Sequence, residues 1–190
     1  MTAFSLMDIT IQERRFTFAS EYEISGPGTM LHARKDVFAF PARMQLKLEN
    51  GPTFVTIQGR FSVTRGKYDL RFADGRDFAF QCEKIRKGVY LCQRGDDSYR
   101  LYRHRGLRYS IFQNDRQIAA IVRSRKNVRR GNRFDIRMNS DADLTIVAAM
   151  VLAMNASEQE DQPSDPDVAP VEYGHRRPEE KKFDENWQPT

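Results

Sequence analysis

Hydrophobic and polar residues alternate along most of the first 140 positions of the chain. A two-residue period of this kind is typical of β-strands that bury one face. The alternating segments lie near residues 15–24, 44–48, 54–57, 61–63, 68–72, 78–82, 90–92, 99–103, 109–113, 118–122 and 134–138. Because breaks rich in Gly, Asn and Asp separate many of them, the pattern predicts a mainly β domain of short antiparallel strands.

Three of these breaks have the composition of hairpin turns. Asn50-Gly51-Pro52, Ala73-Asp74-Gly75-Arg76 and Asn114-Asp115-Arg116 each stand between two alternating segments. Strands and turns at this spacing favour a barrel or a sandwich. Closure into a barrel removes the sheet edges at which chains aggregate, so we expect a closed antiparallel β-barrel.

One segment near residue 150 has a different pattern. Residues 144–154 are apolar apart from Thr145, and Asn139-Ser140-Asp141-Ala142-Asp143 before them offers several helix N-caps. A helix that is apolar on every face has to be surrounded by protein. Such a helix would be about 16 Å long, which suits the inside of a barrel. An isolated β-strand is the alternative, because Val and Ile also favour strands.

The chain has two cysteines, Cys82 and Cys92. If a short hairpin with Gly88 in the left-handed conformation joins their strands, the two cysteines lie directly opposite each other. A disulfide would then be sterically possible, although free thiols are expected in a reducing compartment. Neither these cysteines nor the scattered His32, His104 and His175 have the spacing of a metal site, and no cofactor is expected.

Charge is distributed unequally along the chain. Residues 157–190 contain four Lys or Arg and ten Asp or Glu, whereas residues 1–156 contain 27 basic and 16 acidic side chains, a net charge of +11. The acidic segment is poor in hydrophobic residues, which predicts disorder. We therefore divide the chain into an N-terminal extension (1–14), a β-barrel domain (15–156) and an acidic, disordered tail (157–190). The Lys181–Trp187 stretch is interpreted either as a solvated end or as a short recognition segment.

The most unusual polar segment lies between two of the predicted strands. It contains six basic residues and no acidic ones: Arg123, Arg125, Lys126, Arg129, Arg130 and Arg133. Several guanidinium groups in one loop can bind phosphate oxygens in pairs, so these residues form a candidate site for an anionic headgroup. The alternative is a solvated hairpin without a ligand. Other arginines alternate with tyrosines over residues 99–109; such a pattern suits base stacking, but on alternating strands it more often means tyrosines packed inward and arginines pointing to water.

The sequence lacks the motifs of common enzyme classes. It contains no Ser-centred elbow, no phosphate-binding Gly-rich loop and no metal-binding His pair. Asp141 and Asp143 could form a carboxylate pair, but helix capping is the favoured explanation. We therefore expect a binding protein and not an enzyme. The N-terminus does not have the pattern of a secretory signal, and the longest apolar run is shorter than the ~20 residues that span a bilayer. The expected location is the cytoplasm, with peripheral attachment to a membrane as an extension.

The order of elements resembles the end of a known superfamily. Arg133-Phe134-Asp135-Ile136-Arg137-Met138, then Asp141 and Asp143, then an apolar helix, is similar to the tubby C-terminal-like group. The resemblance is strongest to its LURP-one-related branch, to which the phospholipid scramblases are related, and it covers residues 16–154. It implies a closed barrel of about twelve strands around a buried helix. It also implies binding of phosphoinositides or work at membranes, but no family binding residue maps onto a specific position of this chain.

Three functions follow in order of preference. The first is a binding module for anionic phospholipid headgroups at the cytoplasmic face of a membrane, because the barrel domain is strongly basic. The second is nucleic-acid binding by the same basic surface. The third is a structural or regulatory protein that meets a protein partner through its acidic tail.

Overall fold

The computed structural model describes residues 7–16, 19–36, 41–60, 66–84, 88–125, 131–160 and 180–190. Twelve antiparallel strands form a closed barrel in which each strand pairs with its neighbours in the sequence and β1 pairs with β12. The strands are β1 (Met7–Phe16), β2 (Ala19–Gly26), β3 (Thr29–Asp36), β4 (Arg43–Leu48), β5 (Thr53–Gly59), β6 (Lys67–Phe72), β7 (Asp77–Lys84), β8 (Val89–Arg94), β9 (Asp97–His104), β10 (Arg108–Gln113), β11 (Arg116–Arg125) and β12 (Asn132–Met138). The predicted fold class is confirmed, and so are the three predicted hairpin turns.

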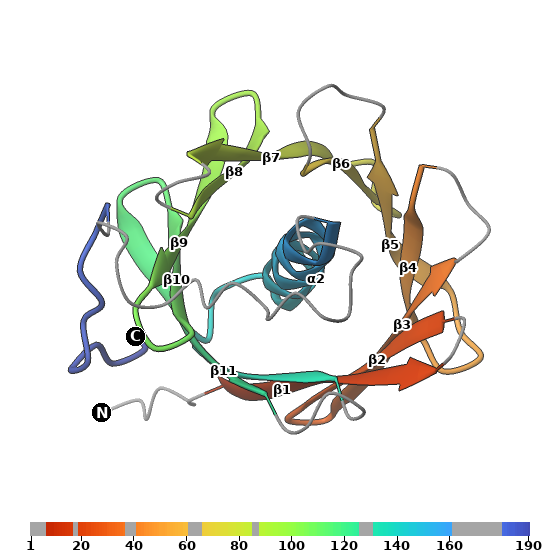
Figure 1. Ribbon diagram of the computed structural model, residues 1–190, viewed down its shortest axis with the longest axis horizontal. Helices are drawn as coiled ribbons and strands as arrows, with labels where there is room; N and C mark the ends of the chain where they lie inside the picture. The colour runs from red at the N-terminus through yellow and green to blue at the C-terminus, as the bar shows by residue number, and fades with distance from the viewer. Residues whose placement is uncertain are drawn as a thin grey trace, which may run out of the picture.

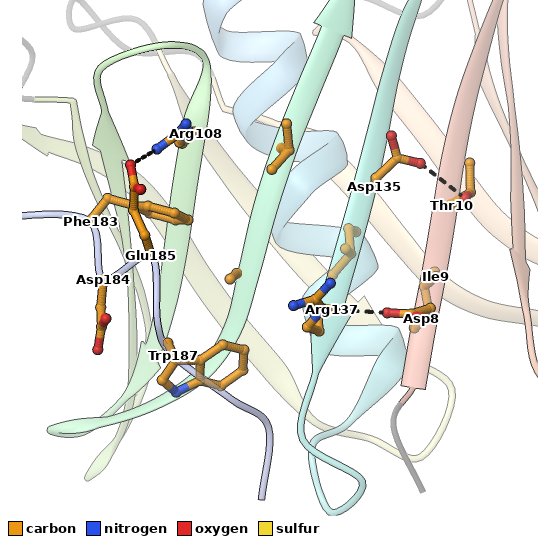
Figure 2. A pocket seen from close by; sticks show the side chains of 13 residues that line it. Asp8, Ile9, Thr10, Arg108, Asp135, Arg137, Phe183, Asp184, Glu185 and Trp187 are labelled. Carbon is orange, nitrogen blue, oxygen red and sulfur yellow. Dashed lines mark hydrogen bonds and ion pairs between the residues drawn. The ribbon is translucent and has the colours of Figure 1, made fainter.

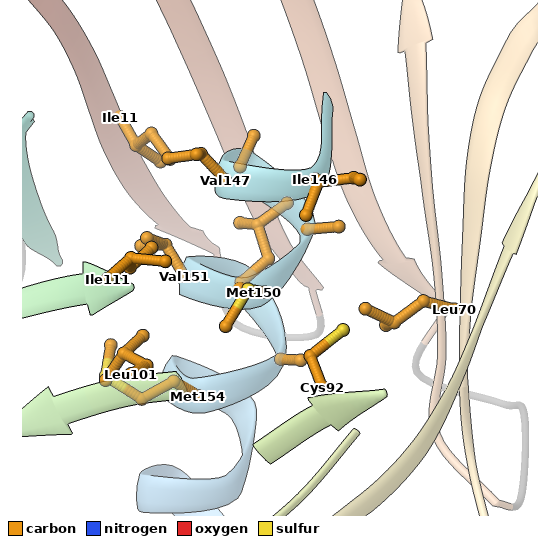
Figure 3. Close-up of a cluster of buried hydrophobic side chains, with 14 of the residues drawn as sticks. Ile11, Leu70, Cys92, Leu101, Ile111, Ile146, Val147, Met150, Val151 and Met154 are labelled. Carbon is orange, nitrogen blue, oxygen red and sulfur yellow. The ribbon is translucent and has the colours of Figure 1, made fainter. Parts of the chain in front are cut away.

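Within the described part of the chain, one helix, α2 (Leu144–Glu160), lies inside the barrel (Figure 1). Every residue from 146 to 157 is buried, so no face of the helix is left to solvent over three turns. In Figure 3, Val147, Val151 and Met154 lie on the side of Ile11, Ile111 and Leu101. The prediction of a buried helix is therefore confirmed, and the alternative of an isolated strand is wrong.

The strands supply the other half of this core through their period-two pattern. Ile9, Ile121 and Ile136 occupy paired positions on three neighbouring strands, and all three are buried. Residues between them, such as Val122 and Asp135, are exposed on the outer face. Alternation thus sorts the side chains into a dry interior and an outer surface, as expected for a barrel that surrounds an apolar helix.

Two boundaries differ from the sequence-based expectation. The barrel begins at Met7 and not at residue 15, because residues assigned to an N-terminal extension form β1. The alternation of Ile9 and Ile11 is interrupted by Glu13, a charged residue at a position that faces inward and is fully buried. The predicted strand over residues 15–24 is accordingly the end of β1 and most of β2, with Phe16 paired to Ala19.

The C-terminal part of the chain also differs. Residues 157–160, assigned to a disordered tail, continue α2, and residues 180–190 lie beside the outer wall near β9 and β10 (Figure 1). Composition predicted disorder because it reflects only the apolar surface that a segment can bury by itself. It carries no information on whether the segment packs against the surface of a folded domain. The intervening residues 161–179 lie outside the described part of the chain. The predicted strand at 61–63 does so too.

The two cysteines are not directly opposite each other. A shift in register between Cys82 and Lys84 pairs Cys82 with Tyr90 and Cys92 with Phe80. The structure has no disulfide between them, and burial raises the pKa of Cys92 to about 12. The prediction that the two cysteines lie opposite each other assumed a regular three-residue hairpin. The pairing of β7 and β8 is irregular instead, and this shifts the cysteines out of register.

Asp143 caps the first turn of α2 and connects it to the wall. Its Oδ1 atom accepts hydrogen bonds from the backbone amides of Thr145 (2.8 Å) and Ile146 (3.3 Å), and its Oδ2 atom lies 2.9 Å from Arg76 Nη2. Burial alone would raise the pKa of Asp143, but the hydrogen bonds from Thr145 and Arg76 lower it overall. The ionised carboxylate therefore stabilises both the helix end and its attachment to the β6–β7 hairpin.

Replacing a side chain of α2 tests whether the helix is part of the folding core. Met150 is fully buried, so Met150→Ala should lower the free energy of unfolding by about 2–5 kcal/mol in urea titrations. Met30→Ala is the matched control, because Met30 is 48% exposed, and its effect should stay below about 0.5 kcal/mol. Equal effects of the two substitutions would contradict a buried helix.

Asp143→Ala should cost about 1–2 kcal/mol of stability at pH 7 through the lost cap. Because the folded-state pKa of Asp143 lies below that of the unfolded chain, its contribution is complete above pH ~4 and is lost as the pH falls through the folded value. Urea titrations of wild type and variant between pH 7 and pH 3 should therefore converge at the acid end. Asp96→Ala, which removes an exposed carboxylate at the same end of the barrel, serves as the control and should change the stability by less than about 0.5 kcal/mol.

Candidate functional site: the basic rim

The two ends of the barrel differ in charge. The end at which α2 terminates carries the connections 17–18, 37–42, 60–66, 85–88, 105–107 and 126–131, and we call it the basic rim. The opposite end carries the connections 27–28, 49–52, 73–76, 95–96, 114–115 and 139–143, and we call it the acidic rim. The assignment follows from the up-and-down order of the strands, which places every second connection at the same end.

The connections of the basic rim contain eight basic residues and no Asp or Glu: Arg60, Arg65, Arg86, Lys87, Arg105, Lys126, Arg129 and Arg130. They also contain four phenylalanines: Phe18, Phe38, Phe40 and Phe61. The acidic rim has six acidic residues, Glu49, Asp74, Asp96, Asp115, Asp141 and Asp143, and a single basic one, Arg76. Loops carry binding residues more often than the strands that hold them, and here the loops of one end are strongly cationic.

Only part of this rim belongs to the described residues. Arg60 and Arg105 are exposed, and Arg60 Nε donates to Asp69 Oδ1 at 2.7 Å. Lys84, at the end of β7, lies 2.6 Å from Glu180 of the C-terminal segment. The other six basic residues and the four phenylalanines lie outside the described residues, and only their positions in the sequence between strand ends are known.

The six residues predicted as the headgroup site are not all placed on one surface. Arg123 is 4% exposed and points into the barrel. Arg133 lies on the outer face, where its Nε donates to Asp135 Oδ1 at 2.9 Å. Arg125 ends β11, and nothing is described of its side chain, while Lys126, Arg129 and Arg130 lie outside the described residues. The structure therefore does not bring Arg123 and Arg133 together.

Arg123 belongs to a buried polar network beneath the basic rim. Its Nε donates to Asn132 Oδ1 at 3.1 Å, and its Nη1 donates to Tyr109 Oη at 3.3 Å and to the Glu158 carboxylate. Arg103 Nη1 reaches the other oxygen of Glu158 at 3.2 Å. Burial lowers the pKa of Arg123, but Tyr109 and Glu158 beside it raise it overall, so the guanidinium stays charged.

Glu13 holds the opposite side of this network. Its Oε2 accepts from the backbone N (2.9 Å) and Nδ2 (2.7 Å) of Asn132, and its Oε1 accepts from Gln159 Nε2 at 2.9 Å. Asn155 Oδ1 in turn accepts from Asn132 Nδ2 at 3.1 Å. Gly131 allows this approach, because it has a φ of +71° and an added Cβ would lie 2.7 Å from the backbone oxygen of Glu13.

The network joins the last turns of α2 to six strands, β1, β2, β9, β10, β11 and β12. Its two arginines are matched by the carboxylates of Glu13 and Glu158, so its charges are compensated inside the protein. We interpret it as a structural support for the rim and not as a ligand site. Sequence reasoning missed it, although Glu13 on an inward position and the polar run 155–159 after an apolar helix are its visible signals.

Two further findings bear on the chemistry. Within the described ranges, no group of three or more His, Cys, Asp or Glu side chains is arranged to hold a metal ion. In the same ranges, no helix combines the length and hydrophobicity that crossing a bilayer requires.

Comparison with models of protein families, with curated proteins and with solved structures finds no match to this chain.

Removing one charge from the buried network should be far more costly than removing one from the surface. Glu158→Gln leaves Arg123 and Arg103 without their shared carboxylate, and we expect a loss of about 3–5 kcal/mol in unfolding free energy. Glu23→Gln is the control. Glu23 pairs with Arg14, whose side chain is 64% exposed, and removing this surface ion pair should lower the unfolding free energy by less than about 1 kcal/mol. A small, equal loss in both variants would show that the network contributes little.

Proposed function

We propose that this protein is a non-catalytic binding module for anionic phospholipid headgroups and that the basic rim is the surface it presents. The observation that carries the proposal is the composition of the six strand connections at this rim, in which eight Lys or Arg residues and four Phe residues occur without an acidic one. Each basic residue near an anionic membrane contributes about 1 kcal/mol, and aromatic side chains bury well at the membrane interface. A purely electrostatic contact would not use the phenylalanines.

The topology supports this proposal in a second way. Arg103 and Arg123 are neutralised by Glu158 inside the barrel, so the proposal does not count them among the binding cations. In the sequence, Lys126, Arg129 and Arg130 stand between the end of β11 and the start of β12 without an acidic neighbour. The opposite end is acidic, so the charges of the two rims would turn the barrel with its basic rim toward an anionic surface. The resemblance to tubby-like proteins, in which phosphoinositides are bound, points in the same direction.

Sedimentation with vesicles tests the proposal. Full-length protein should bind phosphatidylserine-containing vesicles and bind neutral phosphatidylcholine vesicles weakly. Binding should be lost as salt rises from about 0.05 to about 0.5 M, because the electrostatic screening length falls about threefold over this roughly tenfold increase in salt. Replacing Arg125, Lys126, Arg129 and Arg130 by Gln should weaken binding about 100-fold or more.

The matched control removes the same charge elsewhere. Lys47, Arg71, Arg94 and Arg137 are exposed and lie toward the acidic end of their strands, so their replacement by Gln should leave most of the binding intact. Equal losses in the two quadruple variants, or equal binding to neutral vesicles, would count against a rim-specific headgroup site. Filter binding of single- and double-stranded nucleic acids across the same salt range decides whether nucleic acid is the preferred anionic partner.

A further inference from the structure

The C-terminal residues 180–190 follow the outer wall of the barrel and interact with it at several points. His104 Nδ1 lies 2.9 Å from the backbone oxygen of Lys181, and Arg108 pairs with Glu185. At the far end, the backbone N of Thr190 donates to Asn139 Oδ1 at 2.9 Å. The segment therefore runs from the basic rim toward the acidic rim, across the outside of β9, β10 and β11.

Aromatic anchors fix the first part of this segment. The Lys181 ammonium lies 3.6 Å from the centre of the Phe112 ring, and the Phe183 ring is 5.2 Å from the His104 ring and 5.3 Å from the Arg108 guanidinium. Phe112 and His104 are almost fully buried. His104 is held in place by Ser110, whose Oγ lies 2.7 Å from its Nε2. The wall thus has a site built for an aromatic side chain next to a cation.

Beside the segment lies a groove that the segment leaves partly open. It has a volume of about 610 Å³ and is lined by Phe183, Glu185 and Trp187 on one side and by β1 and β12 on the other (Figure 2). Val122, which also lines it, is 46% exposed, which is unusual for an aliphatic side chain of this barrel. Thr10, Asp135 and Arg137 complete the far side with polar groups. A longer occupant could therefore bury more apolar surface here than the segment itself does.

The segment is attached by contacts that a competitor can replace. The side chains of the Arg108–Glu185 pair are 40% and 71% exposed, and exposed ion pairs contribute little stability. Most residues of the segment are exposed, while Phe183 and Trp187 are half-buried. Nineteen residues, 161–179, separate it from the end of α2, so its release need not disturb the barrel.

We propose that this outer face is a docking site for an extended acidic peptide of a partner protein, and that residues 180–190 are its intramolecular occupant. The partner would present an aromatic residue to His104 and Arg108, acidic residues to Arg108 and Lys84, and a second large apolar residue to the groove over Val122. This surface meets the basic rim at Lys84 and otherwise follows the side wall of the barrel, and the proposal does not depend on lipid binding.

A competition experiment on the full-length chain tests the proposal. A fluorescein-labelled peptide of residues 179–190 serves as the probe, and its binding is followed by fluorescence anisotropy. In Phe183→Ala/Trp187→Ala, the intramolecular occupant has lost its anchors, and the probe should bind at least about 10-fold more tightly than to the wild type. Adding Arg108→Ala to that variant should abolish the gain, whereas adding Arg94→Ala, which changes an exposed residue of β8 outside the groove, should not.

Three outcomes would overturn the proposal. The first is equal probe binding to the wild type and the Phe183→Ala/Trp187→Ala variant, and the second is equal binding of a scrambled probe. The third is concentration-dependent dimerisation of the wild type, seen by analytical ultracentrifugation and lost in the anchor variant, which would assign the site to exchange of segments between two copies. Vesicle binding is measured on the same variants to separate this proposal from the lipid proposal. Because Phe183 and Trp187 lie outside the basic rim, their replacement should leave vesicle binding unchanged.

Discussion

The structure depends on the mutual burial of α2 and the barrel wall. A helix that is apolar on every face is unstable in water, and a barrel of twelve strands is too wide for its own side chains to fill, since about eight strands give an interior that side chains alone can pack. The helix therefore fills the space inside the barrel, and the barrel wall covers the apolar surface of the helix. The alanines at positions 148, 149 and 153 keep the helix narrow, while Met150 and Met154 supply flexible side chains for irregular spaces.

This arrangement has a consequence at the end of the helix. Asn155, Ser157 and Glu158 belong to the last turns of α2, still inside or at the mouth of the barrel, where unpaired polar groups would be costly. Glu13, Arg123 and Asn132 on the wall meet this requirement with hydrogen bonds and charge compensation. Arg103 and Arg123 of this basic domain therefore bind the end of the helix and are not exposed to a ligand. The net charge of the domain therefore overestimates the number of cations on its surface. The strand topology is needed to decide which arginines face outward.

The sequence predicted the elements that depend on local pattern and missed those that depend on contact across the barrel. Period-two alternation, the Asp74-Gly75 and Asn114-Asp115 turns and the uniformly apolar helix each carry their own signal, and the structure has all of them. The start of β1 and the end of α2 were missed because Glu13 and Glu158 look like surface residues until each is seen beside its partner. For the same reason, Arg123 was grouped with the loop that follows it. The basic rim became visible only when the strand order placed distant connections at one end.

The geometry also relates the two proposed surfaces. The docked segment pairs with Lys84 close to the basic rim and reaches Asn139 at the acidic rim, so the groove extends along the side of the barrel. If the basic rim faces a membrane, the barrel axis stands roughly upright on it, and the part of the groove around Val122 and Trp187 faces the surrounding solvent. An acidic partner peptide would be repelled by the anionic surface and attracted by Arg108 and Lys84 above it. The same charge separation that orients the barrel would therefore keep its side wall open to a protein partner.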